Sequence, residues 1–239
     1  MTVKTFLKLG RVSNLQTVWT NALAGAVLAG QPTAGPFLTI GAALTLFYMG
    51  GMWLNDAFDA RIDARERADR PIPRGEISKR AVSAGGFALL GAGAGLAFLT
   101  GATAGVAGLG LAAVVLLYDW LHKRTVFSPV IMGSARFFCY ILAAVAVGQI
   151  TGLVLWGALG LLAYTAGLTY AAKQEAFDRL DRAWPLAVLA APLIYSLTQA
   201  AGAAAPVVLW AGFLAVVLLA LRLLIRRARG DVPRAVVTL

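Results

Sequence analysis

Residues 55–75 bring together side chains that could hold a metal ion and a phosphate group. The segment contains five carboxylates and five arginines in a chain that is otherwise mostly apolar. Asn55, Asp59 and Asp63 are four residues apart, so on a helix they stack along one face. Such oxygen donors suit a hard divalent cation such as Mg2+, which commonly shares its coordination with phosphate. A solvated charged loop between two membrane helices is the alternative, and the regular spacing beside an apolar span favours a site.

Basic side chains near this row suit the phosphate itself. Arg67 and Arg70 follow the acidic residues, and a planar guanidinium can bind two phosphate oxygens at once. Arg136 lies within an apolar stretch, where an arginine is costly unless it faces a partner or a wet cavity. We therefore interpret Arg136 as an anion ligand in a polar pocket, with snorkelling to the headgroups as the alternative. Asn14 and Asn21 could line the same pocket or simply hydrogen-bond between helices.

A second acidic group occurs later in the chain. Glu175, Asp178 and Asp181 are spaced three residues apart, which again places them on one helical face. A diphosphate is commonly held by more than one divalent ion. Carboxylates from two separate helices could approach such ions from opposite sides. Two acidic groups separated by basic residues are stronger support for a diphosphate site than either group alone.

The composition predicts an all-α fold, a polytopic membrane bundle of about eight transmembrane helices. Apolar residues make up 59% of the 239 residues and charged residues only 13%, whereas soluble proteins carry about a quarter charged residues. Apolar stretches of roughly 17–25 residues can each cross the hydrocarbon core as a helix. We expect one membrane domain over residues 1–239 without a soluble appendage. The expected spans are 14–31, 36–55, 80–99, 102–119, 128–149, 152–170, 184–201 and 205–224.

The distribution of lysine and arginine predicts the orientation of these spans. All 21 basic residues fall in alternate connections or at the two ends, and the connections between them carry no charge. The positive-inside rule then places both termini and the charged loops in the cytoplasm, for a protein of the inner membrane. The net charge of +10 reflects this topology and anionic headgroups, and it gives no reason to expect a nucleic acid partner.

Three remaining features have structural interpretations. The basic N-terminus leads into an apolar stretch that we interpret as an uncleaved first span, because no cleavage site followed by a soluble domain appears. Cys139 is the single cysteine, which excludes an intramolecular disulfide, and its apolar setting indicates packing. His122 lies beside Lys123 and Arg124. A histidine in such a place is more often a polar residue at the end of a loop than a catalyst.

The motifs resemble those of the UbiA superfamily of intramembrane prenyltransferases. The stretch Asn55-Asp56-x-x-Asp59-x-x-x-Asp63, with Arg67-x-x-Arg70-Pro71-x-Pro73, looks like the first Asp-rich motif of that family. Residues 11–14 are similar to the opening of its first helix, and residues 118–129 are similar to its central loop. The resemblance extends over essentially the whole chain and looks closest to the EboC-like branch.

Two departures from the family pattern concern the second motif and the number of spans. Tyr170-Ala171 is present, but Gln174 stands at the first acidic position and Asp178 at the second, so Glu175 would substitute by a shift of one residue. Family members typically have nine spans, and we expect eight. These departures bear on metal stoichiometry and on the acceptor more than on the fold.

The resemblance implies Mg2+-assisted transfer of an isoprenyl group from an isoprenyl diphosphate to an electron-rich acceptor, aromatic or another small lipophilic molecule, at the lipid bilayer. It implies Asp59, Asp63 and Asp178 as catalytic residues, with Asn55, Asp56 and Glu175 joining them around the metal. The diphosphate ligands it implies are Arg67, Arg70, Lys123, Arg136 and Lys173, and the other pocket residues are Asn14, Asn21, Tyr118 and Tyr170.

Three other classes of membrane protein are alternatives to this interpretation. A CDP-alcohol phosphotransferase requires an Asp-Gly-x-x-Ala-Arg pattern that is absent here. Transporters usually place polar groups near the bilayer midplane, whereas the charged groups here lie at one rim. A non-catalytic UbiA-like scaffold that binds a prenyl lipid is the closest rival, because Gln174 weakens the second motif.

Overall fold

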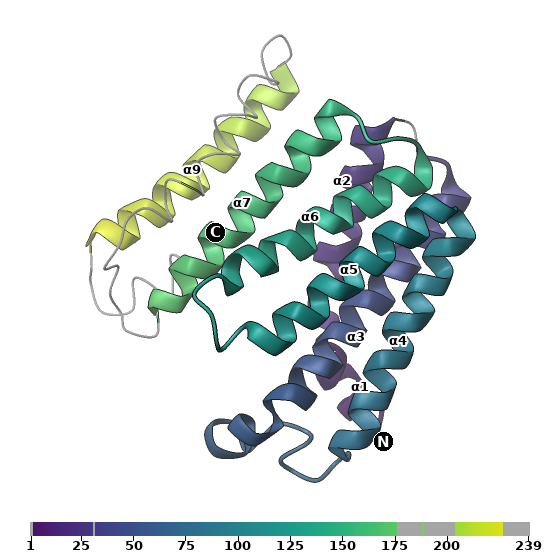
Figure 1. Cartoon of the computed structure of the whole chain (residues 1–239). Helices are drawn as coiled ribbons and strands as arrows, with labels where there is room; N and C mark the ends of the chain where they lie inside the picture. Colours follow the sequence, from purple (N-terminus) through teal and green to yellow (C-terminus); the bar gives the residue numbers. More distant parts are fainter. Residues whose placement is uncertain (1, 31, 176–187, 189–203, 227–239) are drawn as a thin grey trace. The chain divides into compact units, whose positions relative to one another are not determined.

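The computed structural model describes residues 2–30, 32–175, 188 and 204–226, and within them every regular element is a helix (Figure 1). The predicted all-α membrane fold is therefore confirmed. Five helices in the described part of the chain are long and apolar enough to cross a membrane. They are α3 (Ala34–Glu66), α4 (Lys79–Thr100), α5 (Ala102–Leu121), α6 (Ser128–Val147) and the stretch Gly152–Tyr170 of α7 (Gly152–Glu175).

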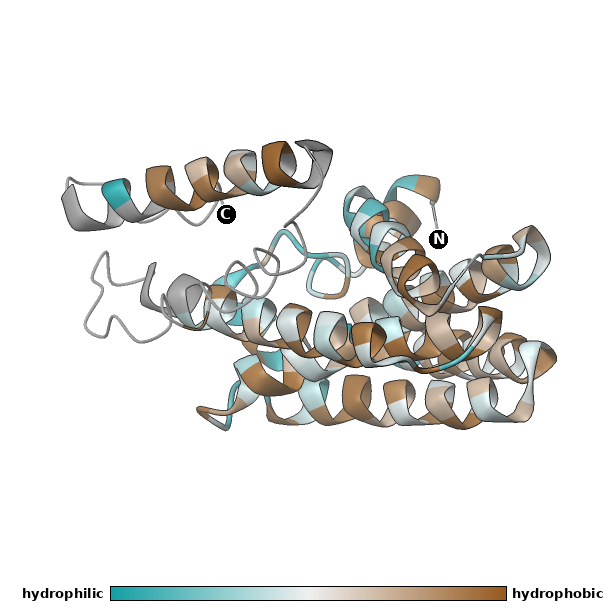
Figure 2. Ribbon diagram, turned by 90° about the horizontal axis from the view of Figure 1, so that it is seen from above, coloured by the Kyte–Doolittle hydropathy of each residue, from teal (hydrophilic) through white to brown (hydrophobic). Residues whose placement is uncertain are grey.

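The count of eight crossings stays a prediction. The expected first and last spans correspond to the helices α2 (Leu15–Ala29) and α9 (Ala204–Arg226). The expected span 184–201 lies almost wholly outside the described residues. Figure 2 shows that apolar and weakly polar residues make up most of the helices and that strongly hydrophilic residues are confined to short segments.

The chain divides into two compact units. Unit 1 comprises Met1–Ser128 and Ser134–Ala158, and unit 2 comprises Pro129–Gly133 and Leu159–Leu239. Unit 1 also contains two short elements, α1 (Val3–Gly10) and the 3-10 turn Val12–Asn14. Within unit 2, Tyr164 of α7 lies against Phe213 of α9 with ring centroids 6.1 Å apart. The expected single domain over residues 1–239 stays a prediction.

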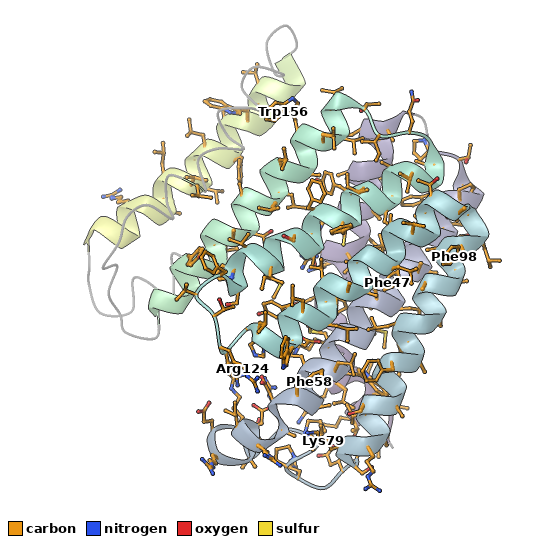
Figure 3. All side chains as sticks on the ribbon, viewed as in Figure 1. Phe47, Phe58, Lys79, Phe98, Arg124 and Trp156 are labelled. Atoms are coloured by element: carbon orange, nitrogen blue, oxygen red, sulfur yellow. The ribbon has the colours of Figure 1, made fainter. Side chains whose placement is uncertain are left out.

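Helix α3 is the centre of unit 1 and packs against α1, α2, α4 and α5. Its residues Ile40, Leu44 and Phe47 are at most 1% exposed. They join buried residues of α2, α4, α5 and α6 in one apolar cluster. Figure 3 places Phe47 within this bundle and Phe58 nearer the end where Lys79 and Arg124 lie. The core thus fixes α3 along its apolar length and leaves its charged end at one end of unit 1.

Close packing of α3 and α4 depends on glycine. A Cβ atom on Gly50 would lie 2.9 Å from the carbonyl oxygen of Gly86, and one on Gly86 would lie 2.6 Å from Cγ of Leu54. Small residues allow membrane helices to approach this closely. Substitution of Gly50 by alanine is expected to destabilise the protein by about 1–3 kcal/mol, since backbone atoms would have to move.

Gly91→Ala is the matched control, because a Cβ atom there meets nothing within 4 Å. The midpoint of thermal unfolding in detergent should fall for Gly50→Ala and stay level or rise for Gly91→Ala, since alanine favours a helix over glycine. Equal midpoints for the two variants would contradict close packing at Gly50.

The length and the ending of α3 place its polar residues. At 1.5 Å per residue its 33 residues extend roughly 50 Å, more than the roughly 30 Å of a hydrocarbon core. The helix ends at Glu66, and the N–H of the next residue, Arg67, donates to the carbonyl of Asp63. Pro71 disfavours helical backbone at Arg70, and α4 begins where Ser78 Oγ accepts from the N–H of Ala81. The acidic end of α3 is therefore a continuation of a membrane helix.

Candidate active site

Four polar side chains at the end of α3 share one face of the helix. Asn55, Asp56, Asp59 and Asp63 lie within an arc of about 100° at 100° per residue. All four are buried, with exposed fractions between 1% and 7%. Burying charge is costly unless the charge is paired. Each carboxylate in this row is expected to have cationic partners, and the structure provides them from three other segments.

Arg70 neutralises two of the carboxylates. Its Nη1 atom donates to Asp56 Oδ1 at 2.8 Å and to Asp63 Oδ2 at 2.7 Å. The Arg70 side chain is itself only 17% exposed. Charge-assisted hydrogen bonds of this length are among the strongest in proteins. They fasten the loop that follows α3 back onto the face of the helix from which the loop departs.

Arg11, which precedes the row in the sequence, also binds one of its carboxylates. Its Nη2 atom donates to Asp56 Oδ1 at 3.2 Å. Arg11 has a left-handed backbone, with φ of 42° and ψ of 49°, which costs a non-glycine residue about 1–2 kcal/mol. The hydroxyl of Tyr48 donates to the Arg11 carbonyl at 3.2 Å and helps to hold this conformation. Backbone strain of this kind is concentrated at functional sites.

Asp59 faces the connection that follows α5. Its Oδ2 atom is 3.2 Å from His122 Nε2 and 3.2 Å from Lys123 Nζ. The hydrogen bond from His122 to Asp59 and the negative charge of Asp59 raise the pKa of the imidazole above its ordinary value. The ring of Tyr118 stacks on His122 with centroids 5.2 Å apart. The Lys123 ammonium group and the His122 imidazole therefore both lie on one oxygen of Asp59.

Asn55 is paired with a carboxylate on α5. Its Nδ2 atom donates to Asp119 Oδ1 at 3.2 Å. Asp119 is 3% exposed. Its second oxygen is buried and has no hydrogen-bond partner among the described residues. A buried acceptor without a partner is uncommon and calls for a physical account. A bound cation or the hydroxyl group of a ligand would provide the missing partner.

The donor chemistry of this row fits a hard divalent cation. Asn55, Asp59 and Asp63 present oxygen atoms, and Asp119 adds a further oxygen beside Asn55. In the part of the chain that is described, no three acidic, histidine or cysteine side chains gather closely enough to form a metal site by themselves. Mg2+ commonly takes only one or two protein carboxylates and completes its coordination with substrate phosphate and water. The described donors suit a metal bound in that shared way.

The remaining residues predicted from the sequence belong to several different elements. Arg67 is exposed at the end of α3. Arg136 Nη2 lies 3.4 Å from Thr17 Oγ1 of α2, so it points toward the first helices. Asn14 is exposed, whereas Asn21 and Tyr118 are partly buried. Tyr170 is a partly buried residue of α7 in unit 2. Lys173 and Glu175 belong to the last turn of α7 without described side chains, and Asp178 lies outside the described residues.

Three residues that contact the row were not among the predicted site residues. Arg11 is 45 positions from Asp56, and Asp119 and His122 are 64 and 63 positions from their partners. A signal was present for Asp119, because a carboxylate at the end of an apolar stretch is costly without a partner. His122 lies one position before Lys123, which was predicted. For Arg11 the signal was the resemblance of residues 11–14 to the opening of the family's first helix, together with its basic charge.

Comparisons with known proteins agree with this architecture. The sequence pattern of the UbiA prenyltransferase family matches residues 18–237. A digeranylgeranylglyceryl phosphate synthase from Methanopyrus kandleri is 32% identical over 70% of this chain and 60% of its own length. Another, from Thermococcus kodakarensis, is 28% identical over 76% of this chain and 64% of its own length. The chain thus matches less than two thirds of the length of these relatives.

Solved structures give the same fold. One comes from a study of digeranylgeranylglyceryl phosphate synthase in membranes, with a TM-score of 0.77 at 19% identity over 98% of this chain and 91% of that one. An apo structure of a UbiA homolog from Aeropyrum pernix K1 has a TM-score of 0.74 at 19% identity over 93% of this chain and 94% of that one. With its acidic row at the end of a long membrane helix and the family pattern along nearly its whole length, the chain belongs to the UbiA prenyltransferase family.

Proposed function

We propose that this integral membrane protein transfers an isoprenyl group from an isoprenyl diphosphate to an electron-rich lipophilic acceptor with the help of Mg2+. One observation carries the proposal: buried carboxylates stand in a row where an apolar helix becomes charged, with guanidinium and ammonium groups beside them. An isoprenyl diphosphate is likewise apolar at one end and charged at the other, because an apolar isoprenyl chain is joined to a polyanion. The row, together with Mg2+ and the basic side chains, can therefore hold the diphosphate while the isoprenyl chain stays among apolar helices.

The reaction breaks the bond between the allylic carbon and the diphosphate oxygen, and the bonding electrons leave with the diphosphate. Bound Mg2+ would lower the negative charge that builds up on this leaving group. Asn55, Asp59 and Asp63 would hold the ion, with Asp56 next to them. The acceptor then donates an electron pair to the cationic carbon and loses a proton.

Basic side chains would bind the diphosphate itself, since donors aimed at developing charge stabilise a transition state. Lys123 already lies 3.2 Å from Asp59, so it can contact an anion that shares a metal with that carboxylate. Arg70 is held by two carboxylates of the row. The further diphosphate ligands and second-motif residues that we propose are Arg67, Arg136, Lys173, Glu175 and Asp178.

The charged end of unit 1 is proposed to face the cytoplasm of the cell. The support is the confinement of basic residues to alternate connections, which the positive-inside rule assigns to the cytoplasmic side. Diphosphate substrates made in the cytoplasm would then reach the row from water, while the isoprenyl chain enters from the bilayer.

Two names among the relatives suggest which substrates to test. The Methanopyrus kandleri relative is named for a product with geranylgeranyl groups on glyceryl phosphate. A Pseudomonas putida relative, 26% identical over 51% of this chain, is a 4-hydroxybenzoate octaprenyltransferase. Geranylgeranyl diphosphate is therefore the first donor to offer, with farnesyl diphosphate as a shorter one. A geranylgeranylglyceryl phosphate and 4-hydroxybenzoate are the first acceptors.

The test is metal-dependent release of pyrophosphate by the purified chain in detergent. We expect release in the presence of donor, acceptor and Mg2+, its loss on addition of EDTA, and its recovery with excess Mg2+. Mass spectrometry of the lipid extract should show the prenylated acceptor. Binding of the donor with neither pyrophosphate release nor product would instead identify a lipid-binding scaffold.

A further inference from the structure

A basic cleft lies between α1 and the loop that follows α3, and none of its residues belongs to the acidic row or to its ion pairs. Its volume is about 340 Å3, and it is lined by Thr2, Lys4, Thr5, Lys8, Arg74 and Glu76. The cleft is a feature of unit 1 alone. Three cationic side chains and one carboxylate meet in it, so its net charge is positive.

The one carboxylate of the cleft is already engaged. Glu76 Oε2 accepts a hydrogen bond from Thr5 Oγ1 at 2.7 Å, and Glu76 Oε1 lies 3.4 Å from Arg74 Nε. In the described part of the chain, neither Lys4 nor Lys8 has an acidic partner within ion-pair distance. The two lysines are one helical turn apart, where like charges repel. An anion between them and Arg74 would relieve this repulsion.

Helix α1 presents an apolar edge beside its lysine edge. Val3 is 76% exposed and Leu7 is 47% exposed. On the opposite side Leu9 is buried, and Phe6 meets Trp53 edge to face at 5.8 Å, which holds the helix against α3. Eight residues extend only about 12 Å, too short to cross a bilayer. A helix with adjoining apolar and cationic edges is typical of one that lies in the membrane interface.

We propose that this cleft binds the phosphate group of an anionic membrane lipid, with the lipid chains beside Val3 and Leu7. Lys4, Lys8 and Arg74 supply the positive charge for the phosphate. A soluble phosphate would meet the same cations but would gain nothing from the exposed apolar edge. The binding is independent of the proposed prenyl transfer.

Native mass spectrometry of the full chain in detergent can test the site, with phosphatidylglycerol and phosphatidylcholine as the probes. We expect the unaltered chain to retain phosphatidylglycerol in preference to phosphatidylcholine. The double variant Lys4→Gln and Lys8→Gln should bind phosphatidylglycerol about tenfold more weakly, because each lysine near a lipid phosphate contributes substantially to binding. A Val3→Ser and Leu7→Ser variant should also lose affinity for the lipid.

The matched control replaces two other exposed basic residues, Lys79→Gln and Arg80→Gln, at the start of α4. It should retain phosphatidylglycerol as the unaltered chain does. An equal loss in the control, or no loss in the lysine variant, would overturn the proposal. Displacement of the lipid by equimolar inorganic phosphate would overturn it as well and would identify a soluble phosphate as the occupant.

Discussion

Replacement of Asp59 by asparagine is expected to reduce pyrophosphate release by about 100-fold or more, the effect typical of losing one charged or hydrogen-bonding group that stabilises a transition state. Asparagine keeps the size of the side chain but removes the negative charge that a divalent ion requires. Asp59 also pairs with Lys123 and His122. Because the lysine side chain is 39% exposed, its ion pair contributes at most about 1 kcal/mol to stability. The rate of pyrophosphate release should therefore fall strongly, whereas the thermal midpoint should fall only slightly.

Asp69→Asn is the matched control for this variant. Asp69 is a carboxylate of the same charged segment, but it is exposed in the loop after α3. Its replacement should leave the rate within about twofold of the original, as expected for a surface residue without a contact to the row. Raising the Mg2+ concentration should recover part of the activity of Asp59→Asn. It should leave the rate of the Asp69→Asn control unchanged. Equal rates in the two variants would remove Asp59 from the proposed site.

Loss of Arg70 is expected to produce the largest effect on stability. Replacement by alanine leaves Asp63 without its ion pair and leaves Asp56 with Arg11 alone. Removing one partner of a buried ion pair costs about 3–5 kcal/mol, which corresponds to a fall of roughly 10 °C in the thermal midpoint for a chain of this size. Differential scanning fluorimetry in detergent would measure it.

Arg67→Ala controls for the loss of an arginine from this loop, since Arg67 is exposed and only its backbone N–H bonds to α3. It should change the midpoint by a degree or two. A double-mutant cycle of Arg70→Ala with Asp63→Asn should give a coupling energy of about 1–3 kcal/mol. Independent, additive effects in that cycle would show that the two side chains do not support each other.

The helical row was predictable because it depends on local spacing. A separation of four residues places Asn55, Asp59 and Asp63 on one face wherever the chain is helical, and the apolar run before them makes a helix the only way to satisfy the backbone in a bilayer. The same argument gave the long membrane helices. Both rest on residues close together in the sequence.

The partners of the row were not predictable from spacing. Asp56 meets Arg11 from 45 positions away, and Asn55 meets Asp119 from 64 positions away. Which helix covers which face is decided by the packing of α1 and α5 against α3. Arg70 shows a second limit, since its basic charge did not reveal that it pairs with two carboxylates of the row. Its role toward the diphosphate stays a proposal. Charge identifies a binding group but not its partner.

The uninterrupted course of α3 has a consequence for how this protein can change during evolution. Its apolar half, around Phe47, and its acidic half belong to one helix of 33 residues. Insertion of a single residue between them would turn every later side chain by about 100° and advance it by about 1.5 Å, carrying the carboxylates away from Arg70 and Lys123. Insertions and deletions among descendants should therefore accumulate in the connections and spare this helix.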